Sequence, residues 1–137
     1  MIGIVIVAHG GLAREYLAAL EHVVGPQAAV RTVAIHPEDD RGAKQAEICA
    51  AADSVDAGEG VVIVTDMFGG SPSNLSLRAC GPDNRRIMYG ANLPMLIKLA
   101  KCRNRPVDTA VALALESGRK YIDAQTVGDD LGMNWAS

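Results

Sequence analysis

The sequence predicts an α/β fold built on a mostly parallel β-sheet, and three observations support this prediction. Short apolar runs rich in β-branched residues recur along the chain at strand length. Longer segments with helical spacing of apolar residues, or with many alanines, separate them. Glycine and proline mark most of the boundaries. Strands that alternate with helices are typical of parallel sheets joined by right-handed crossovers.

The first half of the chain contains three predicted strands and two predicted helices. Apolar runs predict strands over Ile2–Ala8, Val30–Ile35 and Val61–Thr65. Apolar residues at helical spacing predict a helix over Leu12–Val24, which a Gly-Pro pair ends. An alanine-rich stretch predicts a second helix over Arg41–Val55.

The second half continues the same alternation. Short helices are predicted over Pro72–Cys80, Leu93–Cys102 and Pro106–Glu116, the last of them ended by a glycine. A short strand is predicted over Arg86–Tyr89. The tail from Tyr121 has room for one more short strand, and it is poorly defined by the sequence from about residue 124.

Four parallel strands favour a flavodoxin-like three-layer sandwich with strand order 2-1-3-4. This order reverses between the first and third strands, and such sheets bind ligands at the reversal, outside the carboxyl ends of the strands. His9 follows the first strand and Asp66 follows the third. The sequence therefore predicts a His–Asp pair in the crevice where this architecture places its chemistry.

Length and composition fit one domain over residues 1–137, because 49% of the residues are apolar and the chain can bury a core. A net charge of −3 gives no reason to expect nucleic acid as a partner. Cys49, Cys80 and Cys102 lack metal-ligand spacing, which indicates free thiols. Neither a signal peptide nor a membrane span is predicted. These features predict a cytoplasmic protein without metal or cofactor.

Glycine-rich turns beside the predicted pair indicate an anion site. Gly69 and Gly70 lead into Ser71, which suits a helix N-cap, and Pro72 suits the first helical position. The expected phosphate-binding residues are Gly10, Gly69, Gly70 and Ser71, because free backbone N–H groups at a helix start attract anions. Nucleotide-binding glycine motifs and a GxSxG elbow are missing. A phosphoryl group that arrives from one protein and leaves to another fits this pattern best.

Three segments, IVIVAHGG, TDMFGGSPSN and ANLPML, resemble the mannose-family IIA domains of the bacterial phosphoenolpyruvate:sugar phosphotransferase system, over about residues 2–123. The resemblance implies a phosphohistidine carrier in which His9 accepts a phosphoryl group from the phosphocarrier HPr and passes it to a IIB domain. It also implies that Asp66 orients the histidine and that Ser71 lies at the phosphate. A homodimer that exchanges a C-terminal edge strand is implied as well.

The chain departs from the family pattern at three positions. Gly11 stands where many members carry an aromatic residue. Met67 and Phe68 stand where they carry threonine and tryptophan, so a hydroxyl that can bind phosphate is missing. The chain also ends at Ser137, without the linker and IIB domain that some members carry.

Other residues near the predicted crevice have weaker interpretations. Asn92, Pro94 and Met95 form a predicted partner-docking rim, with core packing as the alternative for Met95. His36 is interpreted as a loop residue and His22 as a surface residue of the first helix.

Two other functions remain open at this point. The same carrier can serve regulation, with its phosphorylation state sensed by another protein in place of a IIB domain. A metal chelatase is the remote alternative, since such enzymes also begin with a strand that ends in His-Gly. Recruitment to a membrane permease is compatible with the carrier, which is not itself embedded in the membrane.

Overall fold

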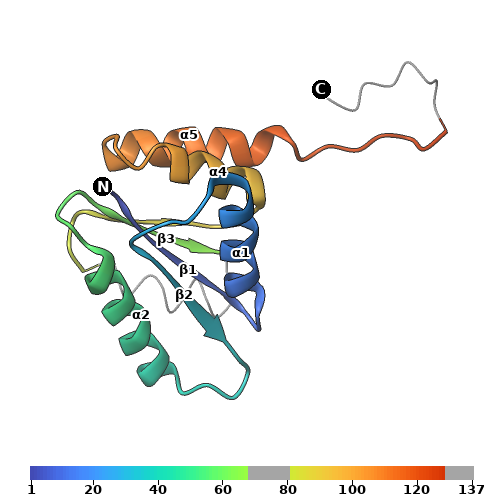
Figure 1. Cartoon of the computed structure of the whole chain (residues 1–137). Coiled ribbons are helices and arrows are strands. Elements are labelled where there is room, and N and C mark those ends of the chain that lie inside the picture. Colours follow the sequence, from blue (N-terminus) through green and yellow to red (C-terminus); the bar gives the residue numbers. More distant parts are fainter. Residues whose placement is uncertain (68–80, 129–137) are drawn as a thin grey trace.

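The computed structural model of the chain describes residues 1–67 and 81–128. Four parallel strands form one sheet with the order β2-β1-β3-β4 (Figure 1). The strands are β1 (Gly3–His9), β2 (Val30–Ile35), β3 (Val61–Thr65) and β4 (Arg85–Met88). This arrangement confirms the predicted flavodoxin-like α/β sheet.

Helices cover both faces of the sheet and complete the three layers (Figure 1). They are α1 (Leu12–Val24), α2 (Arg41–Val55), α4 (Leu93–Lys101) and α5 (Val107–Lys120). One face carries α1, α4 and α5, and the other carries α2. The predicted helix over 72–80 lies outside the described residues.

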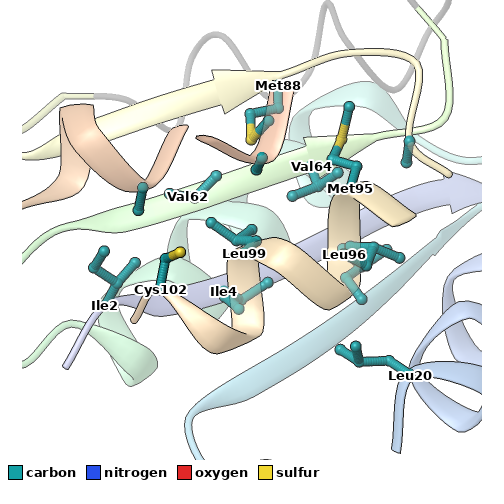
Figure 2. Close-up of a cluster of buried hydrophobic side chains, with 14 of the residues drawn as sticks. Ile2, Ile4, Leu20, Val62, Val64, Met88, Met95, Leu96, Leu99 and Cys102 are labelled. Carbon is teal, nitrogen blue, oxygen red and sulfur yellow. The ribbon is translucent and has the colours of Figure 1, made fainter. Parts of the chain in front are cut away.

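The larger core lies between the sheet and the layer of α1, α4 and α5 (Figure 2). Ile4 and Ile6, alternate residues of β1 that point to the same face, lie in this core together with Ile2, which comes just before the strand. Leu96 and Leu99 of α4 pack against them and are fully buried. Val5 and Val7 of β1 face α2 in a second core. Because both faces of β1 are buried, its sequence is apolar throughout rather than alternating.

The end of α5 corrects one prediction. Gly118 does not stop this helix, which continues to Lys120. Its lack of a side chain serves packing instead, because a Cβ on Gly118 would lie 3.1 Å from Cβ of Met95. The side-chain amide of Asn92 also donates to the Gly118 carbonyl at 2.8 Å. Glycine is needed here for a close approach between α5 and the start of α4.

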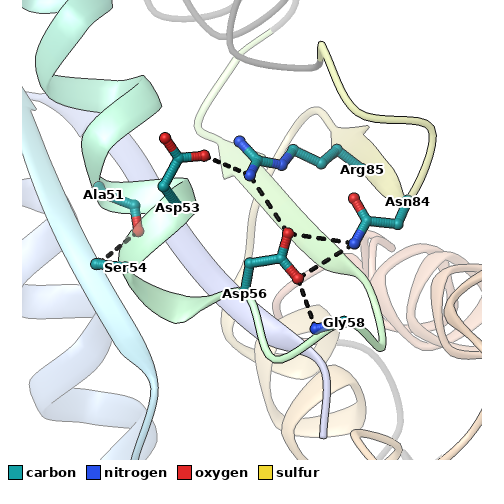
Figure 3. A network of polar contacts seen from close by, with 7 residues as sticks. All are labelled: Ala51, Asp53, Ser54, Asp56, Gly58, Asn84 and Arg85. Carbon is teal, nitrogen blue, oxygen red and sulfur yellow. Dashed lines mark hydrogen bonds and ion pairs between the residues drawn. The ribbon is translucent and has the colours of Figure 1, made fainter.

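A polar network joins the end of α2 to the start of β4 (Figure 3). It lies at the amino ends of the parallel strands, whereas His9 lies at their carboxyl ends. The Arg85 side chain is only 3% exposed, and its Nη2 donates to Asp53 at 2.6 Å and to Asp56 at 3.4 Å. Asp56 also accepts from the amide of Asn84 and from the backbone N–H of Gly58. The buried guanidinium is thereby neutralised by two carboxylates.

Beyond α5 the described tail, residues 121–128, forms no strand and extends away from the body (Figure 1). Ile122 and Val127 in this segment are 73% and 97% exposed. Any strand formed by the rest of the tail lies outside the described residues. No described helix is both long enough and apolar enough to span a membrane.

Candidate functional site

His9 and Asp66 come together at the carboxyl edge of the sheet. His9 is the last residue of β1, and Asp66 directly follows β3. These two strands are neighbours, with Val7 of β1 level with Thr65 of β3. The strand order reverses at this place, so the pair occupies the switch point that the sequence predicted.

Two atoms of His9 contact one oxygen of Asp66. The imidazole Nδ1 lies 3.0 Å from Oδ2, and the backbone N–H of His9 donates to the same Oδ2 at 3.2 Å. The His9 side chain is 48% exposed, whereas that of Asp66 is 11% exposed. The carboxylate therefore lies behind the ring, and the imidazole faces solvent.

This contact determines what the histidine can do. A carboxylate that accepts a hydrogen bond from Nδ1–H fixes the tautomer with a lone pair on Nε2. Among the residues that the structure describes, none makes a hydrogen bond to Nε2 of His9. The exposed nitrogen is thus available as a nucleophile, and the carboxylate can stabilise positive charge on the ring.

The turn after His9 leads directly into the start of α1. Gly10 adopts a positive φ of 57°, and its N–H donates to the carbonyl of Ile35 at 2.9 Å. Gly11 is the N-cap of α1 and offers no side-chain cap. The first-turn N–H groups of α1 are therefore open to an anion next to the histidine.

The second predicted anion-binding segment lies outside the described residues. Phe68, Gly69, Gly70 and Ser71 lie outside the described residues. Met67 is described and is 50% exposed beside the pair. A phosphate-binding role for Gly10, Gly69, Gly70 and Ser71 stays a prediction.

The structure corrects the predicted partner-docking rim at one residue, Met95. Met95 is 4% exposed and packs in the larger core, so its side chain presents no surface to a partner. Core packing, the alternative that the sequence allowed, fits this position. Asn92 caps α4 by accepting from the Met95 N–H at 3.0 Å. Pro94 remains partly exposed in the first turn of α4.

Sequence reasoning missed Tyr16, which lies within the helix predicted over Leu12–Val24. Its hydroxyl donates to the carbonyl of Ala91 at 2.9 Å. Burial raises the pKa of Tyr16, and the negative charge of Asp66 raises it further. Only its place in the second turn of the helix that begins just after His9 could have drawn attention to it.

The other two histidines lie on the surface, in accord with their interpretations. His22 is exposed in the last turn of α1, and His36 is exposed after β2. The described residues contain no cluster of three histidine, cysteine, aspartate or glutamate side chains that could hold a metal ion. Nothing in the described part of the chain therefore favours the chelatase alternative.

A flavodoxin-like sandwich with a solvent-facing histidine and a carboxylate behind it at the switch point has the architecture of a phosphotransferase IIA component. The chain belongs to the EIIA-man family, described as the fructose IIA component of the phosphotransferase system, and the family model matches residues 3–114. The resemblance seen in the sequence is thereby confirmed.

Known proteins similar to this chain agree with the family. The mannose-specific EIIAB component of Escherichia coli K12 is 31% identical over 126 residues, which cover 90% of this chain and 39% of that protein. The chain thus spans about two fifths of the length of the curated relatives first matched.

Solved structures show the same likeness. The mannose/sorbose-specific IIA subunit of Enterococcus faecalis superposes with a TM-score of 0.80 at 28% identity, covering 91% of this chain and 95% of that one. The IIA protein associated with the fucose utilization operon of Streptococcus pneumoniae gives 0.74 at 29% identity, covering 85% and 90%. The EIIA component of Streptococcus agalactiae gives 0.77 at 25% identity, covering 90% and 97%.

Proposed function

We propose that this chain is a cytoplasmic phosphohistidine carrier of the sugar phosphotransferase system. In this role His9 accepts a phosphoryl group from HPr and passes it to a IIB domain. Family membership supports a phosphotransfer role. The observation that carries the choice of residue is the 3.0 Å contact between Nδ1 of His9 and the Asp66 carboxylate.

The proposed step is an in-line displacement at phosphorus. Nε2 of His9 attacks, the new N–P bond forms, and the bond between phosphorus and the donor breaks with its electron pair leaving on the donor. The phosphoryl transition state is loose, so positioning and charge stabilisation carry most of the catalysis. Asp66 stabilises the positive charge that develops on the imidazole as the N–P bond forms.

The equatorial phosphoryl oxygens need hydrogen-bond donors. We propose that the first-turn N–H groups of α1, next to Gly10, supply part of them, because this uncapped helix start adjoins His9. The N–H groups around Gly69, Gly70 and Ser71 are the proposed second part. Asp66 must stay behind the ring, since its negative charge would otherwise repel the phosphoryl group, and its 11% exposure agrees with that position.

Incubation with phosphoenolpyruvate and the two general phosphotransfer proteins, followed by intact mass and peptide mapping, tests this proposal. We expect one phosphoryl group on His9 and none on His9→Ala, while His22→Ala, a matched surface variant, is phosphorylated normally. Circular dichroism should show all three proteins equally folded. Phosphate mapped to His22 or His36 in the wild type would refute the proposal.

The acceptor is tested in a second stage. Phosphorylated protein should lose its phosphoryl group on addition of a purified IIB domain, with the group recovered on that domain. A phosphoprotein that is stable towards IIB domains but binds a regulatory protein differently from the unmodified form would favour the regulatory alternative.

A further inference from the structure

We infer that Tyr16 is a positioning residue for the His9–Asp66 pair. Its hydroxyl holds α1, the helix that begins just after His9, against the loop that follows β4, and this loop is bonded to the end of β3 beside Asp66. The inference rests on the proposed function, which gives the pair its role, and adds a residue to the machinery that keeps the pair in place.

The contacts around the pair form a closed circuit. The Tyr16 hydroxyl donates to the carbonyl of Ala91 at 2.9 Å. The N–H of Ala91 donates in turn to the carbonyl of Thr65 at 3.0 Å. Thr65 is followed by Asp66, which contacts His9. Two glycines then connect His9 back to the helix of Tyr16. Every link except the tyrosine hydroxyl is made by backbone or by the pair itself.

Asp66 depends on this circuit because, among the described residues, only His9 forms hydrogen bonds with its carboxylate. Both hydrogen bonds to Oδ2 come from His9. Oδ1 is buried and has no hydrogen-bond partner within the described residues. Among the described residues no third side chain forms a hydrogen bond with the carboxylate, so the angle between carboxylate and imidazole follows the relative placement of the β1 and β3 ends. Small displacements of a reacting group change rates strongly.

Tyr16 is well suited to this task. Its side chain is half-buried against the larger core, and Ala91, its acceptor, is only 8% exposed. Burial, and after it the negative charge of Asp66, raises the pKa of Tyr16 above its usual value, so the phenol stays protonated and remains a donor. An apolar residue would pack in the same place but would leave the buried carbonyl of Ala91 without its donor.

If the role of Tyr16 were purely structural, its substitution would have a different effect from the one expected of a positioning residue. Loss of the hydroxyl would then lower stability without changing the state of His9. A positioning tyrosine instead changes the balance between the Nδ1–H and Nε2–H tautomers, because that balance depends on the distance and angle to Asp66. The imidazole ¹⁵N chemical shifts report this balance in the unphosphorylated protein.

The test compares Tyr16→Phe with Tyr121→Phe in the full chain. Tyr121 is 57% exposed, and its hydroxyl makes no hydrogen bond among the described residues, so its substitution removes a hydroxyl without the proposed consequence. Relative to Tyr121→Phe, we expect Tyr16→Phe to show a larger Nε2–H fraction on His9. Phosphorylation by phospho-HPr in a single turnover should slow by about two- to twelvefold, which corresponds to the net free energy of one hydrogen bond.

The two readouts separate the inference from the function on which it rests. Unchanged His9 ¹⁵N shifts in Tyr16→Phe would overturn the positioning role, even if the variant were less stable. A wild-type protein that is not phosphorylated on His9 would refute the proposed function, whatever the shifts show. Tyr16→Leu provides a second variant, which should reproduce the shift change if the hydroxyl, and not the ring, is responsible.

Discussion

Nδ1 of His9 lies 3.0 Å from Oδ2 of Asp66, although the two residues are 57 positions apart in the chain. Parallel pairing of β1 with β3 produces this contact, because it brings the carboxyl ends of both strands to one edge. The same Oδ2 also accepts the backbone N–H of His9. The carboxylate is therefore fixed by the residue that it is proposed to orient.

Substituting Asp66 by asparagine should slow phosphorylation of His9 while leaving the fold intact. The amide keeps the shape of the carboxylate but lacks its charge, and its NH₂ group can favour the wrong imidazole tautomer. We expect a loss between about tenfold and the 10⁴-fold that the corresponding change costs in a serine protease triad. Rapid-quench phosphorylation by phospho-HPr measures it.

Asp123→Asn is the control, because Asp123 is an exposed residue of the tail whose carboxylate, within the described part of the chain, accepts a hydrogen bond only from the adjacent Ala124 N–H. Its rate should equal that of the wild type. A rate for Asp66→Asn within a few-fold of the wild type would remove Asp66 from the mechanism and leave it as a turn residue.

The strand order and the location of the pair were predictable from the sequence. Fully buried parallel strands have continuous apolar sequences, and those of β1 and β3 left little choice of strand assignment. Once the order 2-1-3-4 was chosen, topology alone placed His9 beside Asp66. The identity of these two residues then indicated chemistry, because a histidine next to a carboxylate is an activated nucleophile.

Interactions between distant segments were not predictable in the same way. Gly118 had the sequence signature of a helix end, but its glycine serves contact with Met95, a residue 23 positions earlier. Tyr16 fitted the apolar face of α1, and only its partner Ala91, 75 positions away, reveals the hydroxyl's role. Local patterns determine elements, whereas such partners depend on how the elements pack.

Substituting Gly3 by alanine should destabilise the protein without affecting His9. A Cβ on Gly3 would meet the carbonyl oxygen of Val55 and lie 2.7 Å from its Cγ2, so β1 and the end of α2 would have to separate. Overpacking of this kind costs about 1–3 kcal/mol. Urea unfolding measures the loss. Gly81→Ala is the control, because a Cβ there meets no atom of the described residues within 4 Å, and equal stabilities of the two variants would contradict the prediction.

The tail should support a homodimer, as the family resemblance implies. Its described part exposes Ile122 and Val127 away from the body, and unpaired strand edges in the sheet favour association. Deleting the chain from Tyr121 onward should raise the dimer dissociation constant at least about tenfold. Sedimentation velocity over a concentration series measures it. A full-length chain that stays monomeric at micromolar concentration would rule this out.

The network around Arg85 should make stability sensitive to acid. Three groups bind the ionised form of Asp56, and the Gly58 N–H contributes most to holding the pKa of this carboxyl below its usual value. The amide of Asn84 and the Arg85 guanidinium add to the same effect. The folded protein therefore binds a proton at Asp56 less readily than the unfolded chain does.

Asp56→Asn should consequently lower stability at pH 7 by about 1–2 kcal/mol, with a smaller deficit in acid. Because the pKa of Asp56 is lower in the folded protein than in the unfolded chain, ionisation of this carboxyl stabilises the folded wild type. The contribution is complete at pH values above the unfolded pKa of about 3.9, and it is lost as the pH falls through the folded pKa. Urea unfolding at pH 7 and at about pH 3 should therefore show the two proteins converging. Asp53→Asn, with a carboxylate 70% exposed, should change stability less at pH 7. A constant difference between wild type and Asp56→Asn across this range would show that the Asp56 charge does not contribute.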